Sequence, residues 1–146
     1  MKKIVVISSL LVAALMSGCA SVPKASKEKD AAAKTFAAPA AGQSGIYIYR
    51  DSFVGQALKK NVYIDGKLIG ESSNKVFFYS ALPAGTHKLS TESEFSDNAI
   101  ELKTEEGKNY FVEQYIKMGV FVGGAALKPV SETEGKKAVQ KCSLAQ

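Results

Sequence analysis

The chain has 146 residues, of which 46% are hydrophobic and 23% are charged, and its formal net charge is +5. This length and composition fit one globular domain. The charge falls to +3 if Lys2 and Lys3 are removed, and Arg50 is the single arginine, which argues against a nucleic-acid-binding protein with a concentrated basic face.

The N-terminus has the form of a bacterial secretion signal. Two lysines precede an apolar run over 4–16, which is too short for a membrane-spanning helix of about 20 residues. A basic start followed by such a run is typical of a signal peptide. The run ends in LMSGC at 15–19, which resembles the bacterial lipoprotein signal, the lipobox, with Met16 where leucine is most usual.

The lipobox resemblance implies cleavage between Gly18 and Cys19, diacylglycerol on the Cys19 thiol and a fatty acyl chain such as palmitate on the new amino terminus. Two or three acyl chains make the anchor effectively permanent. The family rule for the next position, here Ala20 rather than aspartate, implies the outer membrane facing the periplasm. The alternative is an ordinary secretory peptide with a chance cysteine, in which Cys19 is free to pair with Cys142.

Residues 19–44 are expected to be the lipidated cysteine and a flexible tether. The segment from Ala20 to Ser44 contains nine alanines and one aromatic residue, Phe36, which is too little apolar surface for a core. A mobile linker of this length spans about 25–30 Å. The alternative is a transient helix over 26–38, with Ser26 as its N-cap.

The folded domain is expected over 45–146. Short apolar or alternating runs predict strands at 45–50, 62–64, 67–70, 76–79, 86–92, 100–102 and 110–118. The last of these resumes at 120–122 after Gly119, and 125–130 is the candidate for an eighth strand. Asp65-Gly66 predicts a hairpin with a type I′ turn. Ser131, three residues before Glu134, predicts the N-terminus of a short helix that ends at about Leu144. The pattern indicates a mainly β fold: an antiparallel β-sandwich or small barrel of seven or eight strands with a short C-terminal helix.

Two resemblances accompany this pattern. The stretches VYIDGKLIG at 62–70 and LPAGTHKL at 82–89 are similar to PEGA-type β-sandwich modules of bacterial surface proteins. A broader likeness is carried by YIYRDSFVG at 47–55, STESEFS at 90–96 and GKNYFVEQYIKMGVFVGGA at 107–125. These stretches resemble a family of uncharacterised proteobacterial lipoproteins, the domain of unknown function 2846 family. This resemblance implies no catalytic residue and no cofactor.

The chemically versatile side chains do not form a known motif. His87 is the only histidine and is interpreted as a polar strand residue, which disfavours a transition-metal site. Cys142 is interpreted as a semi-buried small hydrophobe. The acidic run of Glu92, Glu94, Asp97 and Glu101 matches no calcium loop and is interpreted as solvated.

The apolar, glycine-rich stretch 118–126 offers two interpretations. One is a buried strand with a bulge. The other is an exposed surface for a partner or lipid, in which Phe121 and Val122 take part. The leading hypothesis is a lipid-anchored, non-catalytic module that binds an envelope protein or glycan, with no metal and no nucleic acid. The alternatives are an enzyme acting on peptidoglycan or envelope glycans, with two carboxylates in a cleft, and a small-ligand carrier.

Overall fold

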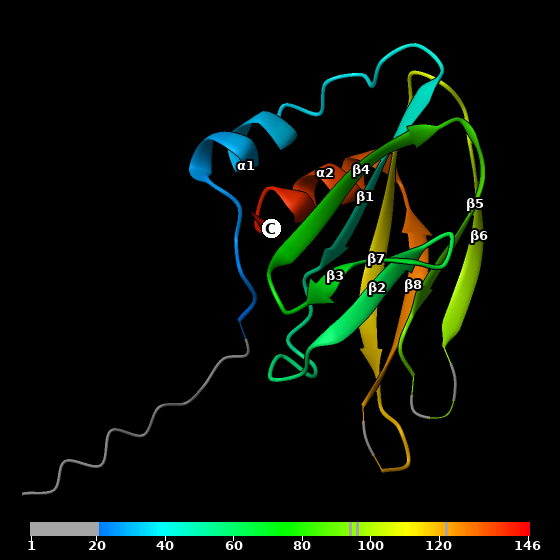
Figure 1. The fold of residues 1–146 in the computed structure, drawn as a ribbon. Helices are drawn as coiled ribbons and strands as arrows, with labels where there is room; N and C mark the ends of the chain where they lie inside the picture. Colours follow the sequence, from blue (N-terminus) through cyan, green and yellow to red (C-terminus); the bar gives the residue numbers. More distant parts are fainter. Residues whose placement is uncertain (1–20, 94, 96, 122) are drawn as a thin grey trace, which may run out of the picture.

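The computed structural model describes residues 21–93, 95, 97–121 and 123–146. β-Strands are the main regular structure in this part of the chain (Figure 1). Its elements, in chain order, are α1 (Lys27–Ala33), β1 (Gln43–Arg50), β2 (Lys60–Ile64), β3 (Lys67–Ser72), β4 (Val76–Pro83), β5 (Gly85–Thr91), β6 (Asn98–Thr104), β7 (Asn109–Lys117), β8 (Gly124–Val130), α2 (Glu132–Val139) and β9 (Ser143–Leu144).

The strands form two separate sheets, which confirms the predicted mainly β fold and favours the sandwich over the barrel. The five-stranded sheet has the order β8-β7-β1-β4-β9, and the four-stranded sheet has the order β3-β2-β5-β6. The prediction of an antiparallel arrangement is correct for most pairs. Two pairs differ, because β1 runs parallel to β7 and β4 runs parallel to β9.

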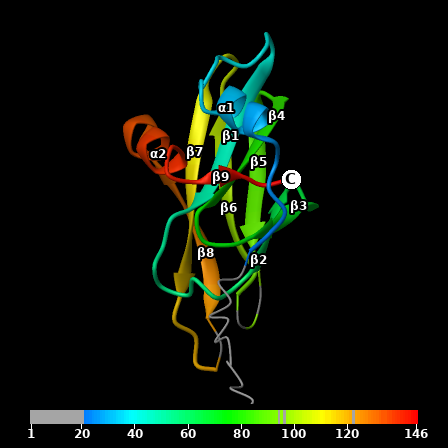
Figure 2. The ribbon, with the colours of Figure 1, turned by 90° about the vertical axis from the view of Figure 1, so that its left-hand side faces the viewer.

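The central strand β1 is buried on both faces. Ile46 and Ile48 join the core between the two sheets, whereas Tyr47 and Tyr49 join a second core on the outer face of the five-stranded sheet. This division follows the two-residue period of a strand. Helices α1 and α2 cover the outer face (Figure 2), so the five-stranded sheet is a middle layer.

The predicted flexible tether is the main point at which the structure differs. Residues 22–44 pack against the sandwich instead of leading away from it. Ser26 caps α1, as the alternative prediction had it, and the helix is short. Phe36 then places its ring 5.4 Å from that of Tyr47 and 5.8 Å from that of Phe111, between ring centroids. One well-placed aromatic ring therefore fixes a segment whose overall composition is that of a linker.

The segment before α1 is also held, by the C-terminus. The amide of Ala25 donates to the carbonyl of Leu144 at 2.9 Å, and the amide of Gln146 donates to the carbonyl of Pro23 at 3.0 Å. Val22 is 8% exposed. The described chain is thus attached to the domain almost from its first residue, Ser21.

Helix α2 begins as predicted, with the Ser131 hydroxyl accepting from the amide of Glu134 at 3.2 Å. It ends at Val139, earlier than the predicted Leu144, because the following residues extend and pair with β4 as β9. Gly135 lets the helix approach the sheet. A Cβ at this position would lie 2.2 Å from the Phe111 side chain.

The sandwich has two different ends. At one end, the connections around 42, 83–85 and 105–108 are tight. At the other end lie the longer connections 51–59, 92–97 and 118–123, whose described residues we call the loop end (lower part of Figure 1). The parallel pairing of β1 with β7 places the first and third of these connections together, and the pairing of Val62 with Thr91 adds the second.

Candidate functional site

The predicted anchor residues, Gly18 and Cys19, lie outside the described residues. The described chain starts at Ser21, two positions after Cys19. No helix in the part of the chain that the structure describes is long and apolar enough to cross a membrane.

His87 is held by acceptors on both ring nitrogens. Its Nδ1 lies 2.7 Å from Asp65 Oδ2, and its Nε2 lies 2.8 Å from the carbonyl oxygen of Pro83. Burial by itself lowers the pKa of His87, but the hydrogen bonds to Asp65 and Pro83 outweigh it, and the net pKa is raised. The hydrogen bond from His87 also lowers the pKa of Asp65. This arrangement clamps the β2–β3 turn onto β5, which agrees with His87 as a polar structural residue.

The acidic run 92–101 does not converge on one point. The Glu92 carboxylate accepts from the backbone amide of Asn61 at 3.1 Å and from the Asn61 side chain at 2.8 Å. These bonds fix the start of β2. Glu101 stands opposite Lys88 in the β5–β6 pair. Asp97 is exposed, and Glu94 lies outside the described residues. In the described part of the chain, no three His, Cys, Asp or Glu side chains lie close enough to hold a metal ion.

Cys142 is buried in the outer core, as the sequence predicted. It is 2% exposed, and its thiol lies 3.6 Å from the carbonyl oxygen of Arg50. Burial raises the pKa of the thiol to about 12. A thiol that stays protonated is a poor nucleophile, so Cys142 has the chemistry of a packing residue.

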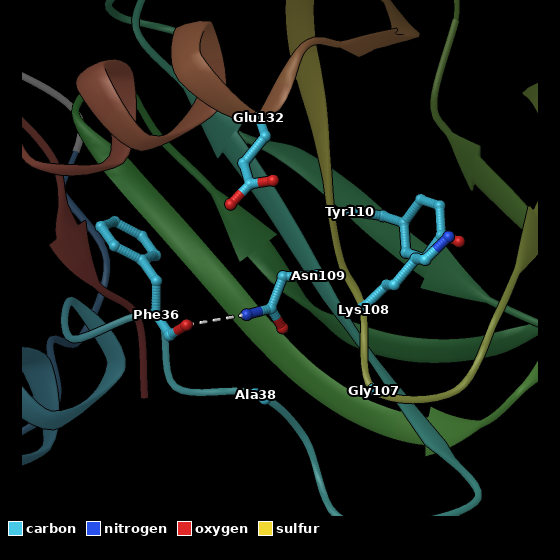
Figure 3. Close-up of a pocket in the computed structure, with 7 residues that line it drawn as sticks. All are labelled: Phe36, Ala38, Gly107, Lys108, Asn109, Tyr110 and Glu132. Carbon is cyan, nitrogen blue, oxygen red and sulfur yellow. Dashed lines mark hydrogen bonds between the residues drawn. The ribbon is translucent and has the colours of Figure 1, made fainter.

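A shallow groove of about 280 Å³ opens where the chain leaving α1 crosses β7 (Figure 3). The Asn109 side chain donates to the Phe36 carbonyl at 3.1 Å, the contact drawn as a dashed line. Glu132 supplies the only carboxylate among the lining residues. The groove therefore lacks the two carboxylates that sugar cleavage requires.

A second groove, of about 260 Å³, has several charged side chains in its lining: Asp51, Glu113, Glu134, Lys137 and Lys141. Two of its carboxylates, those of Asp51 and Glu113, are paired with lysines. Asp51 contacts Lys75 and lies 3.9 Å from Lys141, and Glu113 lies 2.8 Å from Lys128. Asp51 and Glu113 are therefore members of surface ion pairs.

The loop end is the most distinctive surface. Seven large hydrophobic side chains are exposed in the described part of the chain, and Leu68 is the one among them that does not lie on the loop end. The others are Phe53, Val54, Phe95, Met118, Val120 and Phe121. Phe121 is 83% exposed, so the interpretation of 118–126 as an exposed surface fits its first residues. Val122 lies outside the described residues. Ala125 and Ala126 are buried, as the alternative interpretation expected.

The connection 51–59 is fixed from inside the protein by Arg50, which is fully buried. Its guanidinium donates to the carbonyl of Leu58 at 2.7 Å and to that of Gly55. Burial lowers the pKa of Arg50. The sequence marked Arg50 only as the single arginine, and its role depends on contacts that local patterns do not show.

A buried polar chain lies between the sheets beneath the loop end. The Ser72 hydroxyl donates to Oε1 of Gln114, and Nε2 of Gln114 donates to the Thr91 hydroxyl at 2.7 Å. Thr91 in turn donates to the carbonyl of Asn61 at 2.8 Å. Because each of these side chains has a hydrogen-bond partner, the bonds link the two sheets without leaving one of these polar groups unsatisfied.

Sequence reasoning proposed the stretch 118–126, with Phe121 and Val122 named, as one interpretation and missed Phe53 and Phe95 as members of the same surface. A signal for both exists in the sequence. Phe53 stands in a connection with turn residues, and Phe95 stands in the polar run TESEFSDN at 91–98. A lone aromatic residue in a polar loop cannot be part of a core unless the loop folds inward.

Comparisons with known proteins agree with the resemblance noted in the sequence. The family described as "Protein of unknown function (DUF2846)" matches residues 40–125, which is more than half of the chain. An uncharacterized protein of Haemophilus influenzae (strain ATCC 51907 / DSM 11121 / KW20 / Rd) is 61% identical over 134 residues, which cover 92% of this chain and 80% of that protein. No solved structure matches. The chain therefore belongs to the DUF2846 family.

Proposed function

We propose that this protein is a lipid-anchored protein of the bacterial cell envelope, held in the outer membrane and facing the periplasm, and that its β-sandwich is a non-catalytic binding or structural module. The observation that carries the proposal is the lipobox-like LMSGC ending at Cys19, immediately ahead of a folded domain. The acyl chains on Cys19 make the membrane its permanent partner.

The non-catalytic part of the proposal is supported by the state of the reactive side chains. His87 has both ring nitrogens engaged, Cys142 is buried with a raised pKa, and Asp51 and Glu113 are paired with lysines. Groups that are buried or engaged in this way are poorly placed for general acid–base or nucleophilic catalysis. We expect purified protein to leave peptidoglycan undigested, and release of soluble fragments would contradict this part.

The anchor is tested by radiolabelled palmitate, intact mass and membrane fractionation of the wild type and of Cys19→Ala. We expect a labelled wild-type species that begins at acylated Cys19 and sediments with the outer membrane. The Cys19→Ala chain should be unlabelled and uncleaved at Gly18. An unlabelled wild type recovered without membranes would overturn the proposal, and the possibility of a Cys19–Cys142 disulfide would then return.

A further inference from the structure

The loop end presents apolar side chains from three separate connections. Phe53, Phe95, Met118 and Phe121 are between 79% and 83% exposed. Such exposure of large apolar groups is ordinary when they are scattered, but a gathering of them at one end marks an interaction surface. The side chains come from connections that are far apart in sequence, so only the fold brings them to the same end.

The three connections are packed on one another at their bases. A Cβ on Gly55 would lie 2.7 Å from Ile116 Cγ2, and a Cβ on Gly123 would lie 2.6 Å from Leu58 Cδ1. The amide of Ala125 donates to the carbonyl of Glu92 at 2.8 Å, which ties 92–97 to the start of β8. The exposed side chains thus project from connections that pack against one another at their bases.

The covalent chain limits how far this domain stands from the lipid. Cys19 is two residues from Ser21, so their Cα atoms lie within about 7 Å of each other. Residues 22–25 are held against the domain by Val22 and by the bonds to the C-terminus. Figures 1 and 2 both show the described chain running from α1 toward the loop end as it is followed back to its first residue.

We propose that the loop end inserts into the interfacial region of the bilayer that carries the acylated Cys19, with Phe53, Phe95, Met118, Val120 and Phe121 as the inserted side chains. This inference rests on the proposed lipid anchor. The anchor keeps the loop end beside the bilayer at a high effective concentration, so insertion requires no strong affinity of its own. The domain then stands on the membrane by its loop end and directs the tight turns at the opposite end away from it.

The lipid surface fits the loop end better than a protein groove does. The apolar side chains are tips on separate connections, which a fluid bilayer accommodates and a rigid groove must match. Lys117 is exposed beside Met118, where a lysine can extend its charge toward the headgroups while its stem lies along apolar surface. The outer side of α1, by contrast, carries exposed Lys27, Glu28 and Lys29. Since Asp97 is also exposed at the loop end, insertion should not depend on anionic lipid.

The test measures the depth of a fluorescent label in the acylated, full-length protein. Phe121→Cys carries the label, and Leu68→Cys is the matched control, because Leu68 is 52% exposed and lies on the β2–β3 hairpin. Acylated Cys19 has no free thiol, and Cys142 is buried. The protein is reconstituted in phosphatidylcholine vesicles, so dilute that most vesicles carry one copy. Quenching by nitroxide-bearing lipid and by aqueous iodide is then recorded.

We expect the label at Phe121 to be quenched by the lipid-borne nitroxide and to be severalfold less accessible to iodide than the label at Leu68. Equal access of iodide to both labels would overturn the inference. Protection from iodide without quenching by lipid would also overturn it, because a second protein would then cover the loop end. Intact mass on the same samples reports acylation, so a failure of the anchor is distinguished from a failure of insertion.

Discussion

The two ends of the sandwich differ in the length of their connections and in the apolar side chains that they expose. The connections at one end are short, and Gly42, Gly85 and Gly107 adopt positive φ there with open space around each Cα. At the loop end the chain makes longer connections, and Gly55 and Gly123 are needed because side chains crowd them. The first end reverses the chain with little exposed apolar surface. The second end carries apolar side chains that folding does not require, which points to an interaction outside the domain.

Loss of the buried guanidinium should be the most damaging change to the loop end. Arg50→Met removes the donors to the carbonyls of Leu58 and Gly55, and we expect the free energy of unfolding to fall by about 2–4 kcal/mol. Urea denaturation measures the loss, and faster amide hydrogen exchange in 51–59 locates it. The matched control is Lys59→Met in the same connection, which should change stability by less than about 0.5 kcal/mol. Equal free energies of unfolding for the two variants would show that the hydrogen bonds of Arg50 do not stabilise the loop end.

Two glycines allow a direct comparison of crowding with backbone strain. Gly55 and Gly66 have φ of 67° and 78°, but only at Gly55 would a Cβ meet Ile116. Gly66→Ala should therefore destabilise by about 1 kcal/mol through backbone strain alone. Gly55→Ala should cost about 2–3 kcal/mol, because Ile116 must also move. Midpoints of urea unfolding test the difference, and equal midpoints would mean that the connection 51–59 is not seated on β7.

The clamp between His87 and Asp65 should give a small pH dependence. The raised pKa of His87 stabilises the fold fully below its unfolded value of about 6.5, and the gain is lost as pH rises through the folded pKa. The lowered pKa of Asp65 acts oppositely, with its gain lost as pH falls below about 4. Because Asp65 is half exposed, we expect less than about 1 kcal/mol.

The clamp is checked by denaturation of the wild type and of His87→Gln between pH 5 and 8. We expect the wild type to lose stability over the upper part of this range and the variant to show a flatter profile. A variant whose profile parallels that of the wild type would exclude His87 as the source.

The smallest effect on stability is expected at the exposed tips. Phe53→Ser, Met118→Ser and Phe121→Ser in one chain should change the free energy of unfolding by less than about 0.5 kcal/mol per site, because these side chains are exposed in the fold. Thermal and urea unfolding in detergent-free buffer provide the measurement, with Leu68→Ser as the control. A loss comparable to that of Arg50→Met would show that the tips belong to a core, which would remove the contrast between the two ends.

Features that depend on neighbouring residues were predictable. Asp65 and Gly66 adopt the positive φ values of the expected turn, at 51° and 78°, and Ser131 caps α2. Ile46 and Ile48 lie on the opposite face of β1 from Tyr47 and Tyr49, as the alternation along a strand requires. The physical reason is that a turn, a cap and the period of a strand are determined by a few consecutive residues.

The packing of residues 22–44 was not predictable in this way. Composition indicates whether a segment can form its own core, and this segment cannot. It is ordered because Phe36 fits between Tyr47 and Phe111 and because Pro23 and Ala25 bond to the C-terminal residues. A local pattern does not contain such long-range partners.

The sequence by itself therefore determined the mainly β class, the hairpin turn, the helix cap and the lipobox-like signal, and it left the exposure of Phe121 as one of two interpretations. Only the tertiary structure decided that β1 lies parallel to β7, that Arg50 is buried and that Phe53, Phe95 and Phe121 share one end. Strand periodicity sets the face that a side chain takes, whereas the order of strands in a sheet depends on packing between distant segments. The candidate surface exists because that order brings three connections together.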